Sequence, residues 1–125
     1  MIFGNGVDLL EIDRIKELYE KNPRFLERFF TAGECAFFER KMMNIESIAA
    51  NFAAKEAVSK ALGTGVRGFN LIDIEILRDE MGKPIVNLYD RAEILAESLG
   101  IDHIMLSISH TEKHAIAFAI AMKKS

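Results

Sequence analysis

The alternation of apolar and polar residues predicts helices in the first half of the chain and hairpins in the second. Ile72, Ile74 and Ile76 alternate with acidic residues, as in a half-buried strand, and small and large apolar residues alternate over 115–120. We expect a strand over 2–7, helices over 11–19, after residue 23, from residue 31 and over 47–63, strands over 73–78 and 84–89, a helix over 90–100, and strands over 103–109 and 114–122. Helices that precede hairpins predict an α+β fold, with a mainly antiparallel sheet and a long central helix, in one domain of residues 1–125.

Capping residues mark the ends of the predicted helices. Thr31 and Glu34 fit a capping box at the start of the third helix, and Ser47 is the expected N-cap of the fourth. Gly63 is expected to end the fourth helix as a left-handed cap. The last helix is expected to have its caps at Asp90 and Glu93 and to end at Gly100.

The fourth predicted helix carries two different faces. Alanines at 50, 53, 54, 57 and 61 form a narrow stripe that suits close packing, and Gly4 and Gly6 in the first strand allow another backbone to approach. Large apolar side chains lie on the other side of the helix, mixed with charged ones. We therefore expect contacts on both sides. The alternative is an exposed ion pair between Glu56 and Lys60, one turn apart.

Composition narrows the class of protein. Half of the 125 residues are apolar and 28% are charged, which suits a folded core and excludes disorder. The single cysteine, Cys35, excludes an internal disulfide and is expected to be a structural thiol. The longest apolar run has eight residues, over 115–122, whereas a membrane helix needs about twenty. The opening residues lack a secretory signal, so we expect a cytoplasmic protein that does not enter a membrane.

Charge is distributed unevenly along the chain. The net charge of −3 argues against a non-specific grip on nucleic acid. The segment 14–28 nevertheless has five cations and three anions, a local charge of +2, whereas 67–102 has four cations and eight anions. Two interpretations remain open, a pair of solvated surfaces or a basic docking surface for an acidic protein. The cations at issue are Arg14, Lys21, Arg24 and Arg28.

A glycine-rich segment over 63–68 matches the dinucleotide fingerprint G-x-G-x-x-G by letter. That fingerprint binds a pyrophosphate only where it follows a strand and opens a helix, and here it ends a helix. A Rossmann site is therefore not expected. Two interpretations remain, a plain helix cap or a loop whose N–H groups approach a phosphate.

A few polar residues are candidates for chemistry. Asp8 follows the first predicted strand, where a carboxylate can hold a hard cation or simply form a turn. Glu56 and Lys60 lie one turn apart on the long helix, and His110 lies in a hairpin turn. Carboxylates for a cation, a lysine, a glycine loop and a histidine together suit phosphoryl-group transfer, which must neutralise charge on phosphate. The sequence alone does not show that Asp8 and Glu56 meet.

At this point the sequence resembles the small holo-[acyl-carrier-protein] synthases, which are 4′-phosphopantetheinyl transferases. The resemblance extends over essentially the whole chain, and its most specific part is the segment 52–57 with Lys60 and the Gly-Thr-Gly that follows. The other matching segments are Gly4-Asn5-Gly6-Val7-Asp8, Arg14-Ile15, Arg24-Phe25 with Arg28 and Thr31, Gly82-Lys83-Pro84, and Ser107-Ile108-Ser109-His110-Thr111.

The resemblance implies an activity and a site. The chain would transfer 4′-phosphopantetheine from coenzyme A to a serine of apo acyl carrier protein in fatty-acid biosynthesis, releasing 3′,5′-ADP. Asp8, from the motif near the start of one subunit, and Glu56, from the long helix, would hold Mg²⁺, and Lys60 would neutralise the transferring phosphate. The resemblance also implies a homotrimer with active sites between subunits. The coenzyme A groove would be lined by Lys60, Gly63, Thr64, Gly65, Gly82, Lys83, Pro84, His110 and Thr111.

The same resemblance assigns the basic segment and exposes one departure. Arg14, Lys21, Arg24 and Arg28 would dock the acidic acyl carrier protein. Asn51 stands where the family commonly carries arginine, so a phosphate contact is weakened or comes from another cation, such as Arg67 or Lys41. Two alternatives to the transferase follow. One is a catalytically silent module that binds coenzyme A or carrier protein, and the other is a nucleotide hydrolase.

Overall fold

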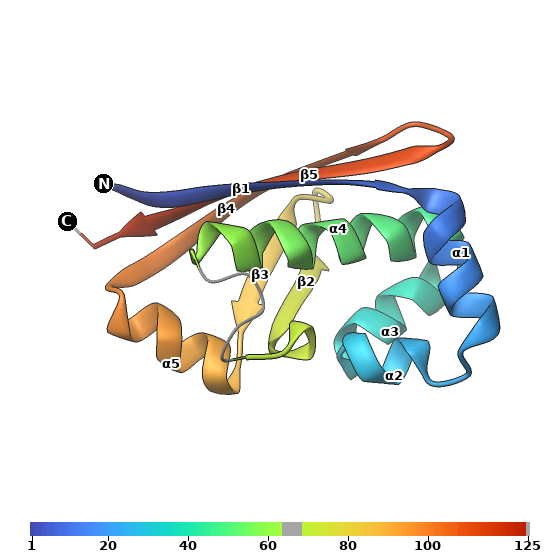
Figure 1. Ribbon diagram of the computed structural model, residues 1–125, viewed down its shortest axis with the longest axis horizontal. Coiled ribbons are helices and arrows are strands. Elements are labelled where there is room, and N and C mark those ends of the chain that lie inside the picture. The colour runs from blue at the N-terminus through green and yellow to red at the C-terminus, as the bar shows by residue number, and fades with distance from the viewer. Residues whose placement is uncertain (64–68, 125) are drawn as a thin grey trace.

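The computed structural model describes residues 1–63 and 69–124 (Figure 1). The elements are β1 (Ile2–Glu11), α1 (Ile12–Lys21), α2 (Phe25–Phe29), α3 (Ala32–Arg40), α4 (Ile45–Ala61), a 3₁₀ turn η1 (Leu71–Asp73), β2 (Ile74–Arg78), β3 (Pro84–Leu88), α5 (Asp90–Ser98), β4 (Ile101–His110) and β5 (His114–Lys123). The expected α+β class with antiparallel strands is confirmed. None of the helices in the described ranges is long and apolar enough to cross a membrane.

The strands form two separate antiparallel sheets. One has three strands in the order β1-β5-β4, and the other is the β2–β3 hairpin. Helix α4 runs along one face of the three-stranded sheet, and the described elements leave the other face uncovered (Figure 1). Both chain ends lie at the same end of this sheet (Figure 1).

Close contact between α4 and β1 depends on small residues. Ala53, Ala54, Ala57 and Ala61 of α4 are fully buried. A Cβ atom at Gly4 would lie only 2.6 Å from the carbonyl oxygen of Ala61, nearer than real Cβ atoms come. The expected close approach of another backbone to the glycines of the first strand is thus confirmed.

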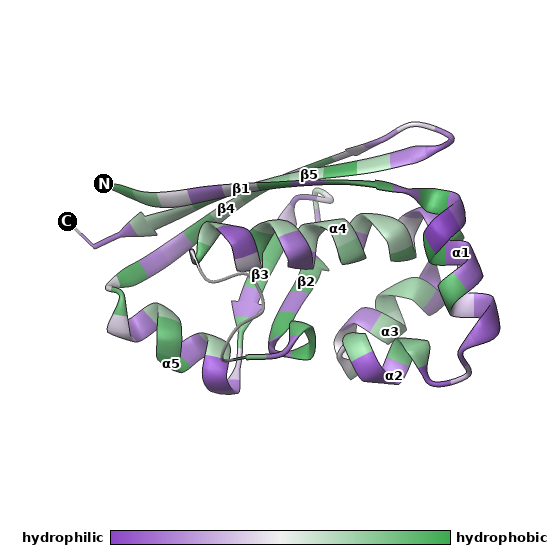
Figure 2. Ribbon diagram, viewed as in Figure 1, coloured by the Kyte–Doolittle hydropathy of each residue, from purple (hydrophilic) through white to green (hydrophobic). Residues whose placement is uncertain are grey.

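The second side of α4 is also covered, as the mixed pattern predicted. Hydrophilic and hydrophobic bands alternate along this helix (Figure 2). Lys55 is fully buried, and its Nζ donates to Glu34 Oε1 and to the carbonyl oxygen of Ile74. Glu34 Oε2 accepts from the backbone N–H of Ile76 at 3.2 Å. These bonds tie α4 to α3 and β2 through polar side chains.

Three local predictions are wrong. The first strand continues to Glu11 because β1 pairs with β5 along its whole length, so Asp8 lies within the strand rather than after it. The N-cap of α4 is Asn44, whose side chain accepts from the N–H of Ser47 at 2.8 Å, so Ser47 is not the cap. Helix α5 begins after Tyr89 without a side-chain cap, so neither Asp90 nor Glu93 serves as one.

Other predicted helix ends are confirmed. Thr31 and Glu34 form the expected capping box at the start of α3. Gly63 and Gly100 follow α4 and α5 with φ of 86° and 76°, a left-handed conformation that glycine adopts without strain.

Candidate functional site

Asp8, Glu56 and Lys60 come together within one chain where β1 crosses α4. Asp8 points toward α4, on the same face of β1 as Gly6. The Nζ of Lys60 donates to Asp8 Oδ1 at 3.2 Å and to the carbonyl oxygen of Val7 at 3.0 Å. Glu56 precedes Lys60 by one helical turn. Lys60 thus pairs with Asp8, and the alternative of a simple Glu56–Lys60 surface pair does not describe this lysine.

The electrostatics of this cluster single out Glu56. Burial raises the pKa of the Glu56 carboxyl above its ordinary value, and the negative charge of Asp8 raises it further. The positive charge of Lys60 partly opposes both effects. Two carboxylates near enough for the charge of one to raise the pKa of the other, with a single lysine beside them, make a site of excess negative charge, which favours a cation.

The donor set of this cluster suits a hard divalent cation. No group of three or more His, Cys, Asp or Glu side chains is arranged to hold an ion within residues 1–63 and 69–124. A site with two carboxylates, Asp8 and Glu56, suits Mg²⁺. That ion commonly takes one or two carboxylates and completes its shell with water and phosphate oxygens.

A groove of about 950 Å³ opens at the other edge of the three-stranded sheet. Five residues predicted to contact coenzyme A line it. They are Gly82, Lys83, Pro84, His110 and Thr111. The groove lies between the β2–β3 turn, β4, α3 and the first turns of α4.

The structure does not join this groove to the Asp8 cluster within one chain. Lys60 and Gly63 belong to the second half of α4 and its end, and they do not line the groove. Thr64 and Gly65 lie outside the described residues, as does Arg67. Since β1 and β4 are opposite edges of the sheet, the two halves of the predicted site lie on opposite edges of the same molecule.

Arg78 lines the groove and was missed by the sequence interpretation. It is the last residue of β2, and its Nη2 donates to Asn51 Oδ1 at 2.9 Å. Its guanidinium carbon lies 4.8 Å from the centre of the Phe37 ring. Lys41, one of the two cations expected to replace the family's arginine, also lines the groove. No local pattern distinguished Arg78, because its contacts come from segments distant in sequence.

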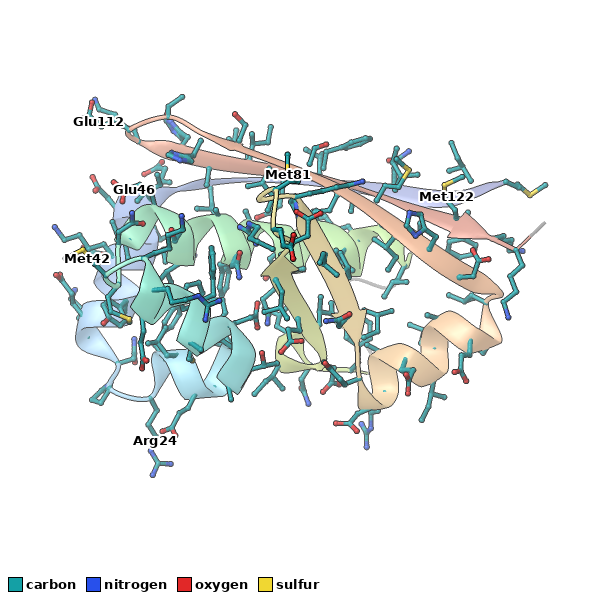
Figure 3. All side chains as sticks on the ribbon, turned by 180° about the vertical axis from the view of Figure 1, so that it is seen from behind. Arg24, Met42, Glu46, Met81, Glu112 and Met122 are labelled. Carbon is teal, nitrogen blue, oxygen red and sulfur yellow. The ribbon has the colours of Figure 1, made fainter. Side chains whose placement is uncertain are left out.

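The four predicted docking cations lie on or beside α1 and α2 and are exposed. Arg24 projects away from the body of the molecule, far from Glu46 and Glu112 at the groove (Figure 3). Arg24 pairs with Glu27 at 3.5 Å, and both side chains are exposed, by 88% and 71%. Arg14 and Lys16 line a shallow hollow together with four carboxylates, those of Glu11, Asp13, Glu17 and Glu20, so the cations do not form one unbroken basic stripe.

The uncovered face of the three-stranded sheet carries several exposed apolar side chains. Val7 and Leu9 of β1 are 51% and 64% exposed, and Phe118 of β5 is 42% exposed. Val7 pairs with Phe118, and Leu9 pairs with Ile116, so these side chains share one face. Exposed apolar side chains grouped on one face in this way are typical of a surface that contacts another protein.

Comparison with known proteins gives concordant results. A family model described as the 4′-phosphopantetheinyl transferase superfamily matches residues 4–119. The holo-[acyl-carrier-protein] synthase of Clostridium botulinum (strain Alaska E43 / Type E3) is 55% identical over 122 residues, covering 96% of this chain and 97% of that protein.

Crystal structures of similar proteins extend the comparison. The holo-[acyl-carrier-protein] synthase of Neisseria meningitidis superimposes with a TM-score of 0.91 at 36% identity, covering 98% of this chain and 100% of that one. The Helicobacter pylori protein in complex with coenzyme A superimposes with a TM-score of 0.83 at 32% identity, covering 94% of this chain and 99% of that one.

Proposed function

Because the chain belongs to the holo-[acyl-carrier-protein] synthases of the 4′-phosphopantetheinyl transferase superfamily, we propose that Asp8, Glu56 and Lys60 form its reaction centre. The chain transfers the 4′-phosphopantetheine group from coenzyme A to acyl carrier protein. The main support for this reaction centre is the ion pair between Lys60 and Asp8, which lie 52 positions apart in the sequence. Glu56 lies near enough for both charges to affect its pKa.

The transfer joins an acceptor oxygen to phosphorus and breaks the pyrophosphate of coenzyme A. A serine hydroxyl of the carrier protein attacks the phosphorus that bears the pantetheine arm, its proton passes to water or to a carboxylate of the site, and 3′,5′-ADP leaves. Charge on the phosphate oxygens must be neutralised while this happens. An ammonium group has three N–H donors, and Lys60 directs two of them to Asp8 and Val7. The third remains for a phosphate oxygen.

Asp8 and Glu56 would hold Mg²⁺, as their chemistry favours. When bound, the ion withdraws negative charge from the pyrophosphate. Asp8 also orients Lys60 through their ion pair, and Gly6 lets β1 lie close enough to α4 for that pair to form. The negative charge of Asp8 and the positive charge of Lys60 are thus held together at the proposed place of phosphate transfer.

A second copy of the chain would complete the site. The reaction centre lies beside the β1 edge of the sheet and the coenzyme A groove lies at the β4 edge. A neighbour that brings its β4 edge to this β1 edge would set its Gly82, Lys83, Pro84, His110 and Thr111 beside Asp8. The exposed apolar face supports such an association. We therefore propose a homotrimer with its sites between subunits, in which Gly63, Thr64 and Gly65 also contact coenzyme A.

Carrier protein would dock on the exposed cations of α1 and α2. An acidic partner is attracted to Arg14, Lys21, Arg24 and Arg28 over distances of about a Debye length, roughly 8 Å at physiological salt. We place the reaction in cytoplasmic fatty-acid biosynthesis, which uses an acyl carrier protein as its acyl carrier.

A mass-shift assay tests the proposal directly. Apo carrier protein, coenzyme A and Mg²⁺ should give a carrier protein heavier by one phosphopantetheine group, and a chelator should abolish the change. The Asp8→Asn variant is a second test, and it should give no transfer even with excess Mg²⁺. Transfer that persists in chelator, or in Asp8→Asn, would overturn the proposed metal centre. Coenzyme A binding without transfer would instead favour a silent module, and nucleotide release without an acceptor would favour a hydrolase.

A further inference from the structure

Asn51, at the position where the resemblance predicts an arginine, belongs to a buried polar network. Asn51 is fully buried and does not line the groove. Its Nδ2 donates to the carbonyl oxygen of Ile76 at 2.9 Å and to Glu34 Oε2 at 3.3 Å. Its Oδ1 accepts from Arg78 Nη2 at 2.9 Å. Asn51 is therefore held on one side by buried partners and holds an arginine on the other.

Arg78 is fixed before any ligand arrives. Asn51 binds one end of its guanidinium, the carbonyl oxygen of Leu77 accepts from Nη1 at 3.2 Å, and the Phe37 ring lies against the group. Cation–π contact with an aromatic ring restrains a guanidinium without using its hydrogens. The Arg78 side chain is therefore already ordered, so ligand binding does not have to supply the entropy cost of ordering it.

Arg78 retains binding capacity. A guanidinium has five N–H donors, and two of them are used by Leu77 and Asn51. Arg78 forms no ion pair with a carboxylate in the part of the chain that the structure describes. The nearby Glu34 is already paired with Lys55. The remaining donors are suited to an anion with several oxygens, and phosphate matches the fork of an arginine.

The other charged residues of the groove leave it with an excess of positive charge, which favours binding of an anion. Lys41 and Lys83 line it together with Arg78, against two carboxylates, Glu46 and Glu112, and His110 adds an imidazole with hydrogen-bonding nitrogens. Both glutamates lie at the same end of the molecule, Glu112 on the turn between β4 and β5 (Figure 3). These three cations outnumber the two anions, whereas at the Asp8 centre two carboxylates accompany one lysine.

We propose that Arg78, positioned by Asn51, binds the ribose phosphate of coenzyme A and thereby selects the 3′-phosphorylated donor. The proposal rests on the function proposed above, in which the pyrophosphate reacts at the Asp8 centre. Coenzyme A carries one other phosphate, the monoester on its ribose, and the separate cationic groove is the place for it. Arg78 brings this positive charge to the groove from β2, and Asn51 is its positioning residue.

Ligand binding without catalysis tests Arg78. Calorimetric titration with 3′,5′-ADP and with 5′-AMP, which lacks the 3′-phosphate, needs neither carrier protein nor metal. Arg78→Gln should weaken 3′,5′-ADP binding about 10- to 100-fold, as the loss of a charge-assisted contact does, and leave 5′-AMP nearly unchanged. Arg78→Lys should give an intermediate loss, because the charge remains and the fork is lost. Equal losses for both ligands, or no loss for either, would overturn the proposal.

A double-variant comparison tests Asn51. Asn51→Ala should weaken 3′,5′-ADP binding in the natural chain and have little further effect in the Arg78→Gln background, because Asn51 acts through Arg78. An equal loss in both backgrounds would overturn the positioning role. Arg91→Gln, an exposed arginine on α5, is the matched control and should leave binding unchanged.

Transfer activity separates this proposal from the function on which it rests. At saturating coenzyme A, Arg78→Gln should retain a kcat near that of the natural chain, while its KM for coenzyme A rises and its KM for dephospho-coenzyme A does not. A chain with no transferase activity at all would contradict the proposed function. The binding measurements would still decide the role of Arg78, because they depend on neither metal nor acceptor.

Discussion

The Nζ atom of Lys60 lies 3.2 Å from Oδ1 of Asp8, which joins the end of the long helix to the middle of the first strand. The aspartate side chain is 18% exposed and the lysine side chain 49% exposed. The pair is open enough to meet a ligand and is worth little as a stabilising contact by itself. We interpret it as part of a binding site, with Glu56 beside it.

Glu56→Gln should lower activity and raise stability together. Loss of a metal-site carboxylate is expected to reduce transfer at least about tenfold. Burial and the charge of Asp8 disfavour the ionised Glu56 in the folded chain, so a neutral side chain should raise Tm in chelator at neutral pH. Steady-state kinetics and thermal unfolding measure the two effects. Glu97→Gln, at an exposed position on α5, should change neither, and a Glu56→Gln chain with full activity would remove this residue from the centre.

The Mg²⁺ requirement should depend on pH through Glu56. A proton and a metal ion compete for the carboxylate, and the pKa of Glu56 is raised by burial first and by Asp8 second. The Mg²⁺ concentration for half-maximal activity should therefore increase as pH falls through the raised pKa of Glu56. This increase should begin at a pH above the ordinary pKa of glutamate, which is about 4.3. Titration of activity with Mg²⁺ at several pH values measures this. A requirement that stays constant down to that ordinary range would contradict the assignment.

The stability of the metal-free chain should also depend on the protonation of Glu56. Low pH weakens Mg²⁺ binding but should stabilise the metal-free fold. The folded chain binds the Glu56 proton more tightly than the unfolded chain, because its pKa is raised. The contribution of this group to the free energy of unfolding is therefore fully present only below the ordinary pKa of the unfolded chain, decreases as pH rises, and is lost once pH has passed the raised pKa. Urea unfolding in chelator, compared between the natural chain and Glu56→Gln, isolates this contribution. Identical pH profiles for the two chains would show that the Glu56 pKa is not raised.

Arg24→Glu should weaken carrier-protein use and spare coenzyme A. Reversal of a docking charge is expected to raise KM for carrier protein several-fold, and the rate of the natural chain should fall with added salt. Arg91→Glu, on α5 at the other end of the molecule, is the control (Figure 1). Stability should change little, because the Arg24–Glu27 pair is exposed. An effect confined to coenzyme A would exclude Arg24 from the docking surface.

Lys55→Met should destabilise the fold without removing a ligand contact. Lys55 and Glu34 are both fully buried, and removal of one partner leaves a buried charge unpaired. The expected loss is about 3–5 kcal/mol in the free energy of unfolding, measured with urea. Lys16→Met, at an exposed position on α1, should have almost no effect. A loss below about 1 kcal/mol in Lys55→Met would show that the pair does not support the fold.

Local features of the sequence predicted the elements that depend on neighbouring residues. The capping box at Thr31 is formed by residues three apart, and the left-handed Gly63 depends on its own backbone freedom. The two covered sides of α4 followed from helical periodicity. The misplaced N-cap shows the limit of such patterns, since Asn44 and Ser47 are both good capping residues and only the actual helix start distinguishes them.

Partners distant in sequence were beyond local patterns. Strand β1 extends past the predicted end because β5, from the far end of the chain, pairs with it as far as Glu11. Arg78 is held in position by Asn51 and Phe37, which belong to two different helices. Neither partner is evident from the residues beside Arg78 in the sequence.

The amino-acid sequence by itself determined the α+β class, the faces of the long helix and the family, because these depend on periodicity and on motifs of adjacent residues. The tertiary structure decided which side chains meet. It set Lys60 against Asp8, placed the groove at the opposite edge of the sheet and turned Arg78 toward Asn51. Strand pairing and close packing between helix and sheet bring such segments together, and these interactions join residues whose separation along the chain leaves no repeating pattern.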